Sequence, residues 1–160
     1  MGYEVKLIIG EFMEPRPEYA REKTLRRDGD ELWYPYKKDK DDKFIPSGRM
    51  ESTMIEAGRL DLCKCATGAF GKLVSDNEEA ANKADQNIVW KWWRDGNHED
   101  ETDCYGARKI PVPLEDVIKA IEADVKAGEK YHRFKWTLTL LKSMKKHSGG
   151  WKLKVILYGH

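Results

Sequence analysis

Three cysteines and one histidine are the side chains of this sequence best suited to bind a metal ion. Cys63 and Cys65 form a C-x-C pair, and in a strand both sulfurs would point to one face, where they could chelate one ion. His98 and Cys104 could complete a tetrahedral Cys₃His site of the kind that binds zinc. The C-x₂₋₄-C spacing of structural zinc sites is missing. We therefore expect no metal site and no cofactor, and we keep a zinc-binding protein or small enzyme built on these residues as an alternative.

A run of carboxylates between residues 95 and 103 is the second candidate for metal chemistry. Calcium and magnesium need oxygen ligands at fixed offsets, and Gly96 directly after Asp95 does not fit the EF-hand spacing. A catalytic site with two metals would need carboxylates from separate elements. We interpret the run as a solvated hairpin tip or as an acidic patch for a basic partner. The sequence leaves open whether this loop binds a metal.

The segment from Gly68 to Lys72 matches only a fragment of a phosphate-binding loop. Its spacing is short, and Leu73 stands where the G-x-x-x-x-G-K-[ST] pattern requires Ser or Thr. The same residues fit a GXXG clamp on a nucleic-acid backbone, but that clamp needs helices on both sides. Because the preceding Arg59–Cys65 segment is strand-like, we expect a turn at these glycines.

Nucleophilic catalysis has no supporting motif in this sequence. Neither G-x-S-x-G nor H-E-x-x-H occurs, and the histidines are His98, His132, His147 and His160. A dyad of Cys104 with His98 is conceivable, but no pattern surrounds it. We assign no catalytic residue and expect a protein that is not an enzyme.

Basic and aromatic residues alternate near the C-terminus, from Lys130 to Trp136, and further lysines follow. From Gly128 onward, eight basic residues stand against one acidic residue, a net charge of +7, although the whole chain carries only +1. Basic grooves with stacking aromatics bind single-stranded nucleic acid, and basic faces contact phosphates. A charged helix face is also often simply solvated. The binding candidates in this region are Arg133, Lys135, Lys142 and Lys146.

Three tryptophans form the other candidate binding surface, at Trp90, Trp92 and Trp93. The segment from Ile88 to Trp93 is typical of a strand, in which neighbouring side chains point to opposite faces. Trp92 and Trp93 can therefore both be buried only if the sheet is covered on both sides. Otherwise one of them is exposed, and exposed aromatic residues favour interfaces.

The segment 131–147 must position the basic residues, and its pattern fits two structures. Phe134, Trp136, Leu138 and Leu140 alternate as in a strand, but the whole segment sorts better at helical spacing. We predict a helix. Its polar arc holds His132, Lys135, Thr139, Lys142, Ser143 and Lys146, and its inner side holds Tyr131, Phe134, Trp136, Leu138, Leu140, Leu141 and Met144.

Both ends of the chain are predicted to be half-buried strands, at 3–9 and 151–158, that close one sheet. Between them the sequence predicts a helix at 18–27, a loose hairpin or loop over 33–46 and a strand at 59–63. A capping box at Ser75 predicts a helix to about Asp85. A hairpin returning through 102–110 and a helix over 114–128 follow. Residues 1–160 are therefore expected to form a single α+β domain, with a mainly antiparallel sheet and two C-terminal helices packed on it.

The bulk composition bounds the class of protein. At 160 residues with 11% aromatic residues, the chain can build a core although 36% of its residues are charged. An odd number of cysteines argues against a secreted disulfide framework. Neither a signal peptide nor a membrane span is apparent, so we expect a cytoplasmic protein.

These observations favour a small intracellular binding protein that acts on a macromolecular partner. We expect that partner to be a protein and not a membrane, and the oligomeric state is left open. The size and charge pattern would suit a phage or mobile-element accessory protein, such as an inhibitor of a host enzyme. The alternative is a nucleic-acid-binding protein that uses the basic C-terminal helix.

Overall fold

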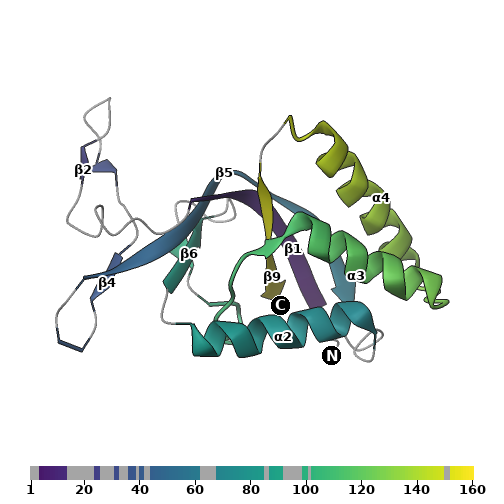
Figure 1. Cartoon of the computed structure of the whole chain (residues 1–160), viewed down its shortest axis with the longest axis horizontal. Helices are drawn as coiled ribbons and strands as arrows, with labels where there is room; N and C mark the ends of the chain where they lie inside the picture. Colours follow the sequence, from purple (N-terminus) through teal and green to yellow (C-terminus); the bar gives the residue numbers. More distant parts are fainter. Residues whose placement is uncertain are drawn as a thin grey trace.

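In the part of the chain that the computed structural model describes, three helices cover one face of a sheet (Figure 1). The structure describes residues 4–13, 24–25, 31–32, 36–38, 40–41, 44–61, 68–84, 87–91, 99–100, 102–149 and 152–160. The architecture is α+β, as the sequence predicts.

The sheet is mainly antiparallel. Its strands follow the order β7-β6-β5-β1-β9-β8, and β4 also pairs with β5. Only the β5–β6 pair is parallel among the described ladders. The bounds are β1 Glu4–Met13, β4 Tyr36–Lys38, β5 Phe44–Asp61, β6 Asn87–Lys91, β7 Glu99–Asp100, β8 Val112–Pro113 and β9 Leu153–Gly159. A separate small ladder joins β2 Thr24–Leu25 to β3 Glu31–Leu32.

The two terminal strands lie side by side at the centre of the sheet, which confirms the prediction from their alternating pattern. β1 pairs antiparallel with β9, with Leu7 opposite Leu157, and on its other side with β5. The two ends are fastened to each other, because Glu4 N donates to His160 O at 3.1 Å and His160 N to Glu4 O at 2.8 Å.

These strands are buried on both faces, so the prediction of half-buried strands is wrong. Val5, Leu7 and Ile9 belong to the core cluster under the helices, whereas Ile8 packs with Ile156 and Tyr158 in a second cluster. Lys6 is only 1% exposed, and its Nζ lies 5.9 Å from the centroid of the Tyr158 ring. The polar residue in an alternating pattern does not always face water, since a long aliphatic stem can pack against apolar neighbours.

The described helices are α2 Ala69–Lys83, α3 Leu114–Lys126 and α4 His132–His147. α3 matches its prediction and ends before Gly128, which has a φ of 97°. The helix predicted over 131–147 is also confirmed. α3 packs between α2 and α4, so α4 lies at one side of the helical layer (Figure 1).

The start of α2 contradicts two predictions. The helix begins after Gly68, and Ser75 stands in its middle, so Ser75 does not cap it. The glycine segment is the first helical turn and not a free turn. The cap comes from another helix: the Asp124 carboxylate of α3 accepts hydrogen bonds from Ala69 N at 2.6 Å and Phe70 N at 2.9 Å. A sequence window cannot reveal a cap that lies so far along the chain.

Other local predictions have mixed outcomes. Tyr36–Lys38 pairs with Phe44–Pro46, which confirms the hairpin there. The return strand after β6 is Glu99–Asp100, and 102–110 is mostly a turn with one bridge, so that prediction is wrong. The helix predicted over 18–27 is contradicted at Thr24–Leu25, which form β2, and its other residues lie outside the described ranges.

Candidate binding surface on helix α4

Helix α4 is held against the sheet by a narrow buried face. Phe134 and Leu141 are fully buried, and Thr137 is 5% exposed. Phe134 also meets Phe70 of α2 edge to face, with ring centroids 6.0 Å apart. Thr137 lies directly on Gly58 of β5, since a Cβ built on that glycine would be 2.9 Å from Thr137 Oγ1. The missing side chain at residue 58 therefore allows this close approach of helix and strand.

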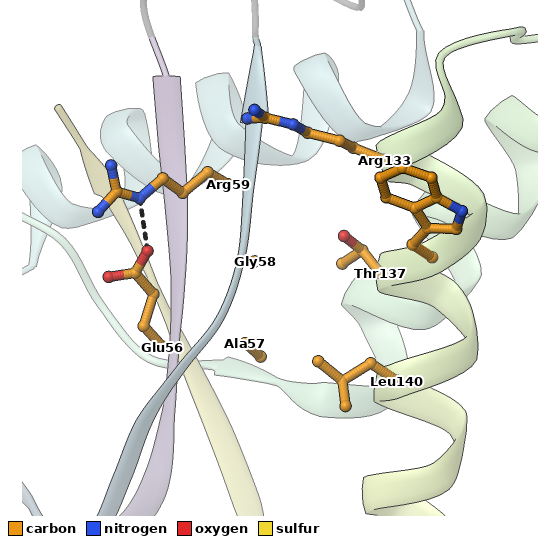
Figure 2. Close-up of a pocket in the computed structure, with 8 residues that line it drawn as sticks. Glu56, Ala57, Gly58, Arg59, Arg133, Thr137 and Leu140 are labelled. Atoms are coloured by element: carbon orange, nitrogen blue, oxygen red, sulfur yellow. Dashed lines mark hydrogen bonds and ion pairs between the residues drawn. The ribbon is translucent and has the colours of Figure 1, made fainter.

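A hollow of about 390 Å³ lies between α4 and β5 (Figure 2). In Figure 2, Thr137 and Leu140 point from the helix toward the strand, where Ala57 and Gly58 lie. We name this hollow the edge groove. Its lining residues are Glu56, Ala57, Gly58, Arg59, Arg133, Trp136, Thr137 and Leu140.

Two large apolar residues of the edge groove are exposed. Trp136 is 69% exposed and Leu140 is 43% exposed. The prediction that both belong to the inner side of the helix is wrong. The physical reason is the position of α4: α3 packs along one of its sides, and no described helix covers the other. His132, one turn before Trp136, stacks on the indole with centroids 6.2 Å apart.

Two arginines line the edge groove, and each guanidinium is close to a carboxylate. The Arg133 side chain reaches from α4 toward the strand, whereas the Arg59 side chain points away from α4 (Figure 2). Arg59 Nε donates to Glu56 Oε1 at 2.6 Å, and this hydrogen bond raises the pKa of Arg59. Arg133 Nη1 is 3.6 Å from Glu4 Oε1, and its side chain is 47% exposed. Both groups keep open directions for donation, because a guanidinium carries five N–H bonds.

The lysines on the other side of α4 are partly neutralised, which the sequence did not predict. Lys142 Nζ donates to Glu122 Oε1 of α3 at 2.6 Å, and Lys145 Nζ lies 3.2 Å from Glu115 Oε1. The hydrogen bond from Lys142 lowers the pKa of Glu122, and that from Lys145 lowers the pKa of Glu115.

Two hollows of about 380 and 500 Å³ run along this lysine-rich side and share Glu115 and Lys145. We name them together the lysine groove. Lys135 is exposed on the same helix and forms no ion pair within the described ranges. The lysines that line the groove are Lys119, Lys142, Lys145, Lys146, Lys152 and Lys154.

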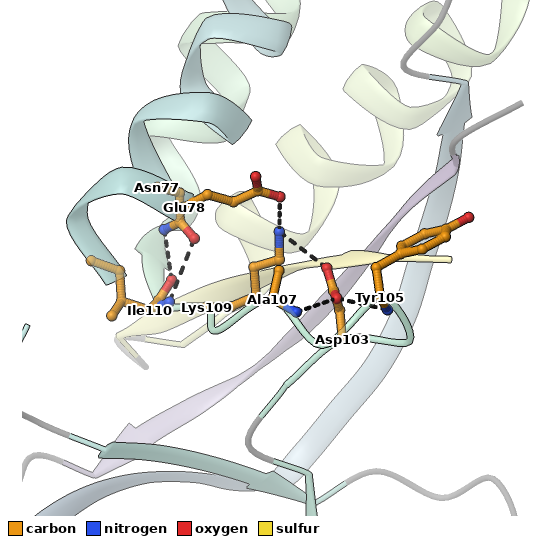
Figure 3. A network of polar contacts seen from close by, with 7 residues as sticks. All are labelled: Asn77, Glu78, Asp103, Tyr105, Ala107, Lys109 and Ile110. Atoms are coloured by element: carbon orange, nitrogen blue, oxygen red, sulfur yellow. Dashed lines mark hydrogen bonds and ion pairs between the residues drawn. The ribbon is translucent and has the colours of Figure 1, made fainter. Parts of the chain in front are cut away.

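A second polar site lies between α2 and the turn at 103–107 (Figure 3). The side chain of Lys109 is fully buried and donates to Glu78 Oε1 of α2. Its Nζ lies 3.2 Å from Asp103 Oδ2, at ion-pair distance but without hydrogen-bond geometry. Asp103 Oδ1 accepts from Tyr105 N at 3.0 Å and Ala107 N at 2.9 Å.

This network is a structural site. Lys109 pairs with Glu78 of α2, and Asp103 binds the amides of the turn, so the network holds the turn against α2. Tyr105 at the turn is 59% exposed. The burial of Asp103 and Lys109 was not predicted from the sequence. The sequence feature that could have indicated this turn is Asp103 followed closely by Gly106. An aspartate at the start of a turn often accepts a hydrogen bond from the backbone amide two residues further along.

The predicted site residues fall into separate places. Arg133, Lys135, Lys142 and Lys146 all lie on α4, where Arg133 lines the edge groove and Lys142 and Lys146 line the lysine groove. Trp90 is in β6, and its backbone pairs with Met50 and Asp100. Trp92 and Trp93 lie outside the described residues.

The metal-site candidates are only partly described. Cys63, Cys65 and His98 lie outside the described ranges, and Cys104 is exposed. Within the described ranges, no group of three His, Cys, Asp or Glu side chains is placed to hold a metal ion. The absence of a metal site stays a prediction.

Comparison of the chain with protein-family models, with curated protein sequences and with solved structures finds no match. In the part of the chain that the structure describes, each helix is too short or too polar to cross a bilayer. The function proposed below is derived from the geometry of α4 and its neighbours.

Proposed function

We propose that this chain is a binding protein that uses the outer side of α4 to hold an acidic protein partner. The observation that carries the proposal is the exposure of Trp136 and Leu140, one helical turn apart, along the edge groove. Single exposed apolar residues are common on protein surfaces. Here a tryptophan and a leucine line one hollow together with an arginine. Tryptophan and arginine are enriched at the centres of protein–protein interfaces.

Covering Trp136 and Leu140 with a partner would stabilise a complex at the edge groove. A tryptophan that becomes fully covered by a partner is among the residues that contribute most to binding, and arginine is another. Trp136 and Leu140 contribute little to folding while they face solvent. Packing of the core therefore does not explain why these two positions hold large apolar residues. Arg133 beside them offers a planar donor that suits a carboxylate.

The charge of the C-terminal region supports an acidic partner. The segment from Gly128 carries a net +7 in a chain of net +1. Lys135 and Lys146 are both exposed on α4, and within the described residues neither forms an ion pair. Charges of this kind accelerate encounter with a complementary surface more than they strengthen the final complex.

Nucleic-acid binding is the second candidate function, and the lysine groove is the observation that favours it. Six lysines and two glutamates line that groove, and none of its lining residues is aromatic. Contacts there would be to phosphates, since bases would have no ring on which to stack. Such binding would weaken steeply with salt and would not depend on Trp136.

The test compares two exposed aromatic residues. The tagged chain is used to capture partners from cells of its native host, and the captured protein is then titrated against Trp136→Ala and the matched control Tyr105→Ala. We expect Trp136→Ala to weaken binding at least about tenfold and Tyr105→Ala to change it little. Neither variant should change the thermal midpoint appreciably, because both side chains are exposed. Equal affinity of both variants for the partner would contradict the proposal.

A further inference from the structure

Beside α4, one edge of β5 has no described strand paired with it. On its first edge β5 pairs with β1 from Arg49 to Asp61. On its second edge it pairs with β6 at Ser47–Met50. β4 pairs with Phe44–Pro46, before the stretch that lies beside α4. From Glu51 to Leu60, no strand among the described residues pairs with this second edge. An unpaired edge presents a row of backbone N–H and C=O groups to any extended chain that can reach it.

The edge groove lies at the end of this open edge, and α4 forms its other wall (Figure 2). Glu56 and Arg59 sit on the edge on either side of Gly58 and are bound to each other. Charged residues on an edge disfavour indiscriminate pairing with apolar strands. A strand that enters here must therefore match the charges of the groove as well as its backbone groups.

We infer that the edge groove takes an extended acidic segment of the partner, which adds to β5 as an antiparallel strand. This inference rests on the proposed function and specifies how the partner is held. Backbone hydrogen bonds to the open edge would supply affinity, and alternate side chains of the segment would meet α4. Antiparallel addition is chosen because that pairing is slightly more stable than parallel pairing.

The spacing of the α4 residues predicts the sequence of this segment. Trp136 and Leu140 are four residues apart, about 6 Å along the helix, and alternate residues of a strand are about 6.6–6.8 Å apart. Two apolar side chains at positions i and i+2 of the segment can therefore meet this pair. Arg133 precedes Trp136 on α4. Figure 2 shows Arg133 at the end of the groove where Arg59 lies, and an acidic side chain of the segment fits there. An antiparallel segment then reads, from its N-terminus, acid-x-apolar-x-apolar.

The probe is a fluorescein-labelled synthetic peptide with the core D-T-V-T-V, titrated into the full chain by anisotropy. We expect saturable binding that weakens at least about tenfold with Trp136→Ala and stays unchanged with Tyr105→Ala. Arg133→Glu should weaken the same peptide and improve binding of a matched K-T-V-T-V peptide. A pair of peptides N-methylated on alternate core amides tests the strand itself. The peptide whose methylated amides would face β5 should lose binding, and the peptide methylated on the other amides should retain it.

Three outcomes would overturn the inference. Equal binding of both N-methylated peptides would show that the backbone is not used. If the free chain forms a dimer that Trp136→Ala dissociates, the edge binds a second copy of the chain. If Trp136→Ala binds the peptide with unchanged affinity, the edge groove is not the binding site. The proposed function fails separately, since it requires only that the native partner depend on Trp136. If the native partner binds Trp136→Ala more weakly but the peptides do not bind at all, strand addition is refuted and the proposed function stands.

Discussion

The two ends of the helical layer use charged residues in opposite ways. At the α2 end the charges are inside: Asp124 binds the first amides of α2, and Lys109 is buried between Glu78 and Asp103. At the α4 end the charges are outside: Lys142 joins α3 through Glu122, and both side chains are partly exposed.

The charges at the α2 end therefore fix the positions of structural elements, whereas those at the α4 end lie on the surface. A buried charge costs free energy unless its partners stay in place, so the contacts around α2 fix where the helix and the neighbouring turn lie. An exposed ion pair contributes little to folding and can be exchanged for a partner's charge. We therefore expect substitutions near α2 to change stability and substitutions on α4 to change binding.

The largest effect is expected at Lys109, whose side chain is fully buried. Lys109→Met should destabilise the fold by about 3–5 kcal/mol, because it leaves the buried Asp103 carboxylate without its cation. The measurement is the free energy of unfolding from urea denaturation. The matched control is Lys83→Met, which removes an exposed lysine paired with Glu79 in the same helix. Comparable stability of the two variants would contradict a structural role for Lys109.

Asp124 should have the next largest effect. Asp124→Ala removes both acceptors of the Ala69 and Phe70 amides and should cost about 2–4 kcal/mol, since charge-assisted bonds at a buried helix end are strong. Asp76→Ala is the control, because that carboxylate is 57% exposed and binds only a surface lysine. Binding of the partner through α4 should survive in Asp124→Ala at temperatures where the variant is folded. A loss of binding by the folded variant would contradict the separation of the two ends.

The outline of this fold is predictable from the sequence because it depends on periodic patterns. β1, β9, α3 and α4 were all expected, since each has a regular repeat of apolar residues that persists over several turns or pairs. The sequence does not reveal which faces of each helix or strand are covered by other parts of the chain. Lys6 is buried because the second face of the sheet is covered too, and no alternation within β1 reports that.

The binding surface was only partly predictable for the same reason. The basic arc of α4 follows from helical spacing alone, and the structure places Lys135, Lys142 and Lys146 there. The exposure of Trp136 follows from the position of α4 at the side of the layer, which depends on the packing order α2-α3-α4. The edge groove needs Gly58 and Thr137 in contact, and these residues are far apart in the sequence.

The smallest effect is expected for the ion pair of Lys142 and Glu122, and its sign with pH is defined. The bond from Lys142 lowers the folded-state pKa of Glu122 below its unfolded value. The resulting stabilisation is present above the unfolded pKa, about 4.3, and is lost as pH falls through the folded pKa. Lys142→Gln should therefore match the wild type in acid and lie only marginally below it at neutral pH, because the pair is exposed. Thermal midpoints across this pH range test the prediction. A large deficit at neutral pH, comparable to that of Asp124→Ala, would show that the α4 end is also held by its charges and would remove the contrast between the two ends.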